Sequence, residues 1–139
     1  MFDGRVAVVT GGTCGVSGAI AETLARAGAH VAAGCSKGKG AAEAFRKRMA
    51  QEGRSVSYHQ GRVDDFDDCK RVIDEVARMF DRVDYVTNNA GITIDKTLRK
   101  MTPEDWQSML SVNLSGAFNV PKAALGHMIE RGFGRIVNS

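Results

Sequence analysis

Short apolar runs alternate with longer amphipathic stretches along the whole chain. The run Val6–Thr10 predicts a buried strand, and four later runs predict strands at Ala29–Gly34, Ser55–Gln60, Val83–Thr87 and Gly134–Ser139. A stretch with helical periodicity separates each strand from the next. Such alternation is typical of an α/β fold in which right-handed crossovers join parallel strands. We therefore expect a doubly wound parallel sheet with strand order 3-2-1-4-5.

The first three predicted helices carry apolar residues at intervals of three and four positions. The first ends at Gly28, and the second spans Ala41–Glu52 and ends at Gly53. The side chains expected to face the sheet are Val16, Ala19, Ile20, Thr23, Leu24 and Ala27 in the first helix, Phe45 and Met49 in the second, and Val72, Ile73, Val76 and Phe80 in the third.

The fourth helical stretch is longer than the others. Thr102 is expected to cap its amino end, with Pro103 at the first helical position. The periodic pattern continues to about Arg131. We expect a disturbance near Gly116 and Pro121, because proline removes a backbone donor and tends to kink a helix.

Length and composition limit the class of protein. A chain of 139 residues predicts a single domain over residues 1–139. The formal net charge is +3, but Lys and Arg are interleaved with Asp and Glu, so the charges indicate a solvated surface rather than nucleic-acid binding. No run approaches the roughly 20 apolar residues of a membrane span. Cys14, Cys35 and Cys69 are odd in number and have neither a CxxC spacing nor a His at metal spacing, which argues against a disulfide framework and a zinc site and fits the reducing cytoplasm.

A cluster of glycines follows the first strand. Gly11, Gly12, Gly15 and Gly18 lie between that strand and the first helix. Glycine permits positive φ and close approach of a ligand, and a helix N-terminus presents free N–H groups to a phosphate. An ordinary tight turn would also use glycine. The flanking strand and amphipathic helix favour a Rossmann-type dinucleotide-binding turn.

The loop after the second strand bears on the choice of cofactor. An acidic residue there binds the ribose hydroxyls of NAD, whereas basic residues favour the 2′-phosphate of NADP. This chain has Gly34, Cys35, Ser36, Lys37 and Lys39 in that region and no carboxylate. Because Ser36 can hydrogen-bond a phosphate and Lys37 can neutralise it, the sequence predicts NADP(H). A solvated loop would carry the same lysines.

Three motifs occur in order along the chain, namely Thr10-Gly11-x-x-x-Gly15, Asn88-Asn89-Ala90-Gly91 and Asn113 in SVNLSG. With them the whole chain resembles the short-chain dehydrogenase/reductase family. The segment that begins NAGIT and the later GRIVN are most similar to acetoacetyl-CoA reductases and 3-oxoacyl-[acyl-carrier-protein] reductases. The resemblance implies NADPH-dependent reduction of a 3-oxoacyl thioester, carried by coenzyme A or acyl carrier protein, to the 3-hydroxyacyl form.

The resemblance also implies roles for individual residues. Asn113 is expected to anchor a water in a proton relay. The expected cofactor-binding residues include Ser36 and Lys37 from the loop after the second strand. The full set is Gly11, Gly12, Gly15, Val16, Ser36, Lys37, Val63, Asp64, Asn89, Ala90 and Gly91. Two positions depart from the family pattern. Ser17 replaces the usual third glycine and is expected to crowd the cofactor unless the turn shifts. Arg62 replaces an acidic residue that binds adenine, and we expect that role to pass to Asp64 or to disappear.

The family's chemistry uses a serine just after the fifth strand and a Tyr-x-x-x-Lys motif. Neither tyrosine of these residues starts such a motif, because Tyr58 and Tyr85 are followed four positions later by Arg62 and Asn89. Ser139 is interpreted as a structural residue rather than as the catalytic serine. A tyrosine acid beside a lysine is what protonates the developing alkoxide. The alternative function is therefore a catalytically inactive nucleotide-binding or assembly module.

Two further expectations concern partners. Lys96, Arg99 and Lys100 lie in the loop after the fourth strand, where they would steer the phosphates of a thioester carrier or form plain surface charge. The fifth strand is expected to be an exposed edge. Because a second copy would protect such an edge, we expect a homo-oligomer.

Overall fold

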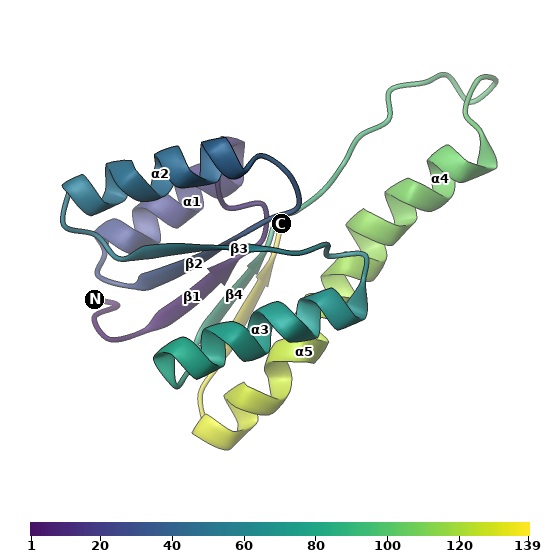
Figure 1. Ribbon diagram of the computed structural model, residues 1–139. Helices are drawn as coiled ribbons and strands as arrows, with labels where there is room; N and C mark the ends of the chain where they lie inside the picture. Colours follow the sequence, from purple (N-terminus) through teal and green to yellow (C-terminus); the bar gives the residue numbers. More distant parts are fainter.

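The computed structural model describes residues 1–139 and contains one five-stranded, all-parallel sheet (Figure 1). The strands are β1 (Val6–Val9), β2 (His30–Cys35), β3 (Val56–Gln60), β4 (Tyr85–Asn88) and β5 (Arg135–Asn138). The helices are α1 (Gly15–Arg26), α2 (Lys39–Gln51), α3 (Phe66–Phe80), α4 (Pro103–Leu110) and α5 (Gly116–Arg131), with a π-helical turn at Ser111–Ser115. The order β3-β2-β1-β4-β5 confirms the predicted fold, and element boundaries agree with the prediction to within two residues.

Helices cover both faces of the sheet. On one face α1 and α2 enclose a core that includes Val9, Val31 and Met49. On the other face, α3 and α5 enclose a second core, which includes Val8 of β1 and Ile73 of α3. Because strand side chains alternate between faces, consecutive residues of β1 serve the two cores in turn.

The predicted inward face of α1 is only partly right. The buried residues of this helix are Ser17, Gly18, Ala21 and Ala25, whereas the predicted stripe was Val16, Ala19, Ile20, Thr23, Leu24 and Ala27. Small side chains let the helix lie close to the sheet. Ile20 and Leu24 pack at the flank of the core, and Val16 is 67% exposed. Size complementarity therefore overrode the apolar periodicity.

The long fourth helical stretch is interrupted where the sequence indicated. A π-helical turn separates α4 from α5 directly before Gly116, and Pro121 lies inside α5. Proline cannot donate to the carbonyl four residues earlier, which belongs to Ala117. That carbonyl accepts a 3.4 Å hydrogen bond from the Asn88 side chain instead. The interruption thus connects the helix to the end of β4.

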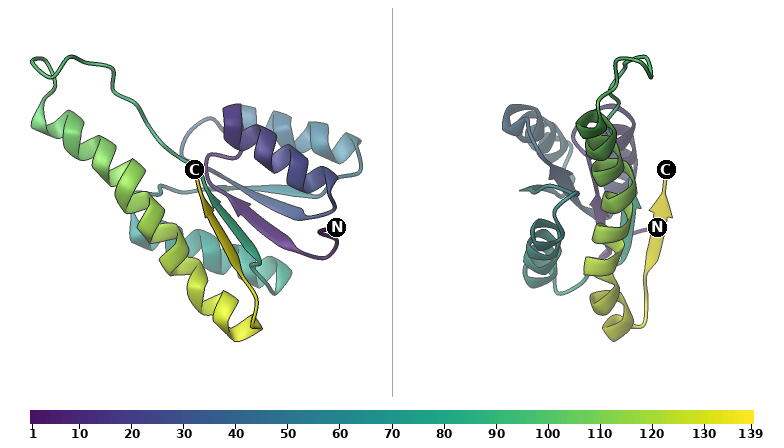
Figure 2. Two further views of the ribbon diagram at one scale, coloured as in Figure 1. Left: turned by 180° about the vertical axis from the view of Figure 1, so that it is seen from behind. Right: turned by 90° about the vertical axis from the view of Figure 1, so that its right-hand side faces the viewer.

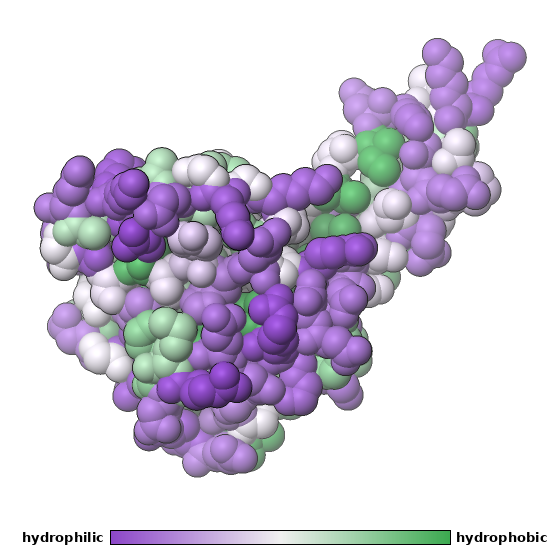
Figure 3. Space-filling view, in the orientation of Figure 1, coloured by the Kyte–Doolittle hydropathy of each residue, from purple (hydrophilic) through white to green (hydrophobic).

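Residues 91–101 and α4 form an arm that extends away from the body of the molecule (Figures 1 and 2). No residue of α4 is buried. As predicted, Thr102 caps the helix: its hydroxyl accepts from the Asp105 N–H, and the Asp105 carboxylate accepts from the Thr102 N–H. Figure 3 shows hydrophobic residues on the arm and at its junction with the body.

At the amino end of the sheet, a charged cluster joins three strands. Asp84 is 1% exposed, and its carboxylate accepts hydrogen bonds from Arg5, Arg82 and the Val6 N–H at 2.7–2.9 Å. The Asp84 carbonyl accepts from the Arg135 N–H. Burial acts to raise the pKa of Asp84, but the bonds from Arg82, Val6 and Arg5 outweigh it and hold that pKa below its usual value.

The remaining structural expectations concern the surface. Strand β5 lies at the edge of the sheet and all four of its residues are exposed, as predicted (Figure 2). The three cysteines are free, and no group of three metal-ligating side chains is present. None of the helices has both the length and the apolarity required to cross a bilayer.

Candidate functional site

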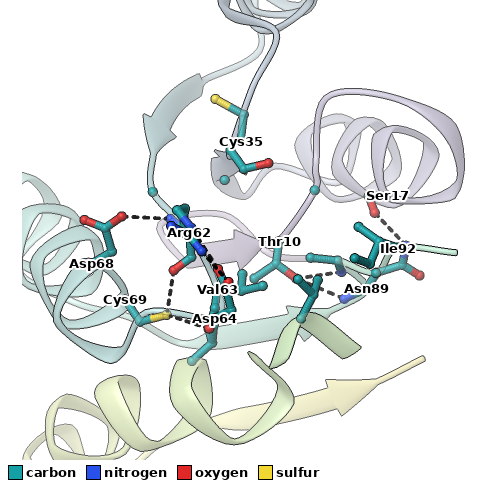
Figure 4. Close-up of a pocket in the computed structure, with 18 of the residues that line it drawn as sticks. Thr10, Ser17, Cys35, Arg62, Val63, Asp64, Asp68, Cys69, Asn89 and Ile92 are labelled. Carbon is teal, nitrogen blue, oxygen red and sulfur yellow. Dashed lines mark hydrogen bonds and ion pairs between the residues drawn. The ribbon is translucent and has the colours of Figure 1, made fainter. Parts of the chain in front are cut away.

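A cleft of about 1180 Å³ opens at the carboxyl ends of the strands (Figure 4). Its walls come from the segments that follow β1, β2, β3 and β4, with a contribution from α4 and the π-helical turn. Typical small-molecule sites have volumes of roughly 300–1,000 Å³. The cleft therefore has room for a ligand of dinucleotide size.

Most of the predicted site residues meet at this cleft. Those that line it are Gly11, Val16, Ser36, Lys37, Val63, Asp64, Asn89, Ala90 and Gly91. Gly12, Gly15 and Asn113 are not part of its wall. The parallel sheet brings the nine together because the carboxyl ends of its strands share one edge.

The glycines of the first turn have separate structural reasons. Gly11 and Gly15 have φ values of +68° and +57°, in the region that favours glycine. A Cβ at Gly12 would lie 2.8 Å from the Val9 carbonyl oxygen, so close packing excludes a side chain there. Around Gly15 no other atom lies within 4 Å of a Cβ position, and the N-cap Cys14 makes no side-chain capping bond. The start of α1 thus presents open backbone N–H groups, which can hold a pyrophosphate.

Thr10 organises the turn that follows β4. Its hydroxyl accepts hydrogen bonds from the backbone N–H groups of Asn89 and Ala90, both at 3.0 Å, and donates to the Thr87 carbonyl. Thr10 belongs to the first of the three sequence motifs, but no role was predicted for it. The available signal was a hydroxyl residue at the end of a strand, next to a turn whose N–H groups need acceptors.

Ser17, which departs from the family pattern, is turned toward Asn89. It is 5% exposed, and its hydroxyl accepts from the Asn89 Nδ2 group at 2.6 Å. A Cβ on Gly11 would approach that hydroxyl to 3.2 Å. Figure 4 shows the bond at the edge of the cleft. The serine therefore connects the glycine turn to the segment after β4.

The loop after β2 contains no carboxylate on the cleft wall. Ser36 and Lys37 line the cleft and are exposed, and Lys37 forms no ion pair. Cys35 lies beside them, and burial raises the pKa of its thiol. This part of the wall therefore offers hydroxyl and ammonium donors to an anion.

A network of charged groups lies at the end of β3. The Arg62 guanidinium donates from Nε and Nη2 to the Asp64 carboxylate at 3.1 and 2.6 Å, and the Arg62 N–H donates to Asp68. Arg71 also binds Asp68. These contacts lower the pKa of both carboxyl groups: for Asp64 the main cause is Arg62, and for Asp68 it is the Arg62 backbone N–H. Both carboxylates are consequently ionised at neutral pH.

Two further cleft residues were not predicted from the sequence. Cys69 donates to the carbonyls of Arg62 and Val63, and burial raises the pKa of its thiol to about 11. The thiol stays protonated at neutral pH and acts as a packing group. His59 is 5% exposed, and its Nδ1 atom makes no hydrogen bond, although a Glu75 oxygen lies 3.4 Å away. Nothing in the spacing of these residues marked them as part of a site.

Asn113 borders a second, smaller cavity of about 250 Å³. It lies in the π-helical turn, and both ends of its side-chain amide bind the backbone of Ile92, through its N–H at 2.8 Å and its carbonyl at 2.9 Å. Ser139 borders the same cavity and donates to the Asn89 side chain. π-Helical turns often occur at functional sites. Here the turn ties the base of the arm to the body.

The remaining candidate residues lie away from the cleft. Neither Tyr58 nor Tyr85 lines it. In the arm, Lys96 pairs with Asp105 at 2.6 Å, whereas Arg99 and Lys100 are exposed and form no ion pair. The arm thus carries two cations that are free to meet an anionic partner.

Comparison with known proteins agrees with the geometry. The short chain dehydrogenase family profile matches residues 5–139. The chain is 39% identical over 135 residues to the acetoacetyl-CoA reductase of Allochromatium vinosum, covering 96% of this chain and 55% of that protein. It is 40% identical to the acetoacetyl-CoA reductase of Cupriavidus necator (96% and 54%) and 35% identical to the 3-oxoacyl-[acyl-carrier-protein] reductase of Escherichia coli (98% and 54%). The chain therefore spans about half the length of these curated relatives. With a glycine turn, a 3-2-1-4-5 parallel sheet and a matching profile over nearly its whole length, it belongs to the short chain dehydrogenase family.

Proposed function

We propose that this chain forms the NADPH-binding part of a reductase that converts a 3-oxoacyl thioester to the 3-hydroxyacyl thioester. The observation that carries the cofactor assignment is the wall after β2, where Ser36 and Lys37 face the cleft without a carboxylate. A ribose 2′-phosphate needs donors and positive charge there, whereas free ribose hydroxyls are bound by an acidic residue.

Each part of the cleft has a distinct task in this proposal. The open N–H groups at the start of α1 hold the pyrophosphate, and Gly11 lets the backbone approach it. The turn Asn89–Gly91, ordered by Thr10, borders the adenosine ribose. When bound, NADPH supplies a hydride to the substrate carbonyl. Asn113 holds Ile92 and with it the base of the arm beside that reaction.

The substrate class rests on the relatives. Their names specify acetoacetyl-CoA and 3-oxoacyl-[acyl-carrier-protein] as substrates. Both are thioesters on a phosphate-bearing or acidic carrier, and the exposed Arg99 and Lys100 give the arm a complementary charge. We assign the arm to the carrier on this basis.

A second candidate is a nucleotide-binding or assembly module without reductase activity. Within these 139 residues neither tyrosine is followed four positions later by lysine, so they supply a cofactor cleft without the tyrosine acid of a reductase. The exposed edge strand β5 supports association with a second copy under either candidate. Sedimentation at micromolar concentration measures that association, and a monomer there would contradict it.

The test is a fluorescence titration of the purified protein with NADPH and, separately, with NADH. We expect saturable binding of NADPH and weaker binding of NADH. Equal or stronger binding of NADH would contradict the cofactor assignment. NADPH oxidation by the protein in the presence of acetoacetyl-CoA would rule out the second candidate, since the module binds NADPH without oxidising it.

A further inference from the structure

We infer that Arg62 is a specificity-determining residue that binds the 2′-phosphate of the cofactor from the β3 side of the cleft. The inference rests on the proposed NADPH site and adds to it a residue from a different strand. From the sequence alone, Arg62 stood out only as a basic residue at a position where the family commonly has an acidic one.

The register of the sheet places Arg62 beside the loop after β2. Cys35 pairs with Gln60 at the ends of β2 and β3, and the Gly61 N–H donates to the Cys35 carbonyl at 3.0 Å. In the continued register Ser36 follows β2 opposite Gly61, and Arg62 is the next residue after Gly61, so Ser36 and Arg62 both lie just beyond the carboxyl ends of adjacent strands. Both line the same cleft.

The guanidinium is held in place but retains unused donors. A guanidinium has five N–H groups in a planar fork. In Arg62 the Nε and Nη2 edge binds Asp64, while Nη1 makes no hydrogen bond, so the end-on edge formed by Nη1 and Nη2 is free. The side chain is 66% exposed. The free edge has the geometry for a two-point hydrogen bond to a phosphate.

The backbone of Arg62 is equally constrained. Its N–H donates to Asp68, and its carbonyl accepts from the Cys69 thiol (Figure 4). Because the backbone of Arg62 is held by Asp68 and Cys69 and its guanidinium by Asp64, the free edge requires little ordering when a ligand binds. Arg62 therefore supplies directed donors at low entropic cost.

The surrounding charges divide the work between two residues. Asp64 compensates the charge of Arg62, and Arg71 compensates Asp68, whereas Lys37 has no ion-pair partner. Lys37 thus provides net positive charge, and Arg62 provides orientation. Removing Arg62 would leave the Asp64 carboxylate facing the phosphate, so the measured effect would combine the missing donors with new repulsion.

The experiment compares two nucleotides that differ only in the 2′-phosphate, adenosine 2′,5′-bisphosphate and adenosine 5′-monophosphate, by isothermal titration calorimetry at one ionic strength. We expect the wild-type protein to favour the bisphosphate by roughly tenfold or more, since a bidentate charge-assisted contact contributes at least that much. Arg62→Gln is expected to remove most of this preference and leave binding of the monophosphate unchanged.

Two controls isolate the donors of Arg62. Arg54→Gln makes the same change of charge before β3, at the opposite end of that strand, and should keep the preference. Arg62→Gln/Asp64→Asn removes the carboxylate as well and should still lack the preference. Circular dichroism of each variant verifies folding.

The outcomes separate this inference from the proposed function. If the wild-type protein binds neither nucleotide, both are overturned. If it favours the bisphosphate and Arg62→Gln keeps that preference, or loses affinity for both nucleotides equally, the NADPH site stands and the role of Arg62 is wrong. Restored preference in the double variant would also overturn it, because Arg62 would then act only by neutralising Asp64.

Discussion

At the amino end of the sheet, the Asp84 carboxylate is buried and both of its oxygens accept hydrogen bonds, from Arg5, Arg82 and the Val6 N–H. At the carboxyl end, Arg62 and Lys37 keep part of their donor capacity directed toward an open cleft. At both ends of the sheet, charged side chains lie next to backbone groups. The two ends differ in whether the protein itself satisfies those charged groups.

The difference follows from what each end does. A buried charge requires full satisfaction, because an unpaired charge inside a protein is costly. A binding site needs the opposite, donors that are positioned but unpaired until the ligand arrives. We therefore expect variants at the amino end to affect stability and variants at the carboxyl end to affect binding. Variants of Thr10 and Asn113 are expected to have effects intermediate between these two kinds.

The largest expected effect is that of Asp84→Ala. Removing the carboxylate leaves Arg5, Arg82 and the Val6 N–H without their acceptor, and we expect a loss of about 3 kcal/mol in the free energy of unfolding. This loss lies at the lower end of the range for a broken buried ion pair, because the side chains of Arg5 and Arg82 are 35% and 30% exposed. Urea denaturation measures it. Asp84→Asn, which keeps an oxygen for Val6, should lose less, and an equal loss in both would contradict the assignment.

The same carboxylate predicts a pH dependence. The pKa of Asp84 is lower in the folded protein than in the unfolded chain, where it is near 3.9. Its contribution is therefore fully present above about pH 4 and is lost as pH falls through the folded-state pKa. The stability gap between wild type and Asp84→Asn should narrow below about pH 4 in urea titrations. A gap that stays constant down to about pH 2 would show that the charge contributes nothing.

A smaller effect on stability is expected for Thr10→Val. The Asn89 and Ala90 N–H groups lose their acceptor in a partly buried turn, so we expect a loss of about 1–2 kcal/mol together with weaker NADPH binding. Thr10→Ser keeps the hydroxyl and should preserve both properties. If the folded Thr10→Val variant binds NADPH as tightly as the wild-type protein, Thr10 does not contribute to cofactor binding.

The smallest effect on global stability is expected for Asn113→Ala, because its contacts are at the surface. We expect a loss below about 1 kcal/mol, with faster hydrogen exchange at the Ile92 N–H. Asn113→Asp keeps an acceptor for that N–H and should keep its protection. Exchange at Ile92 that is equally slow in Asn113→Ala would mean that the amide does not hold the arm.

Much of this contrast could be anticipated from the sequence. Strand order followed from alternating elements, and Gly11, Ser36, Asp64 and Asn89 were each predicted to bind the cofactor; the parallel sheet brings them to one edge. The cap at Thr102 and the interruption before Gly116 were also predictable, because they depend on local backbone chemistry. These features involve interactions between residues close together in the chain or patterns repeated along it.

Other features depend on contacts between distant residues. The inward face of α1 was predicted only in part because the packing distance to the sheet selects Ala21 and Ala25 over larger neighbours. The role of Thr10 depends on N–H groups about 80 positions later. The cluster at Asp84 likewise joins Arg5 and Arg82 through a sheet that must form first.

By itself the sequence determined the doubly wound sheet, the glycine turn and the family, because periodicity and local backbone preferences are properties of the chain. Only the tertiary structure decided which donors are consumed and which stay available. Asp84 and Arg62 are both charged residues beside a strand, and nothing local distinguishes them. Their burial differs because the strands stack their amino ends against arginine side chains and open their carboxyl ends to a cleft.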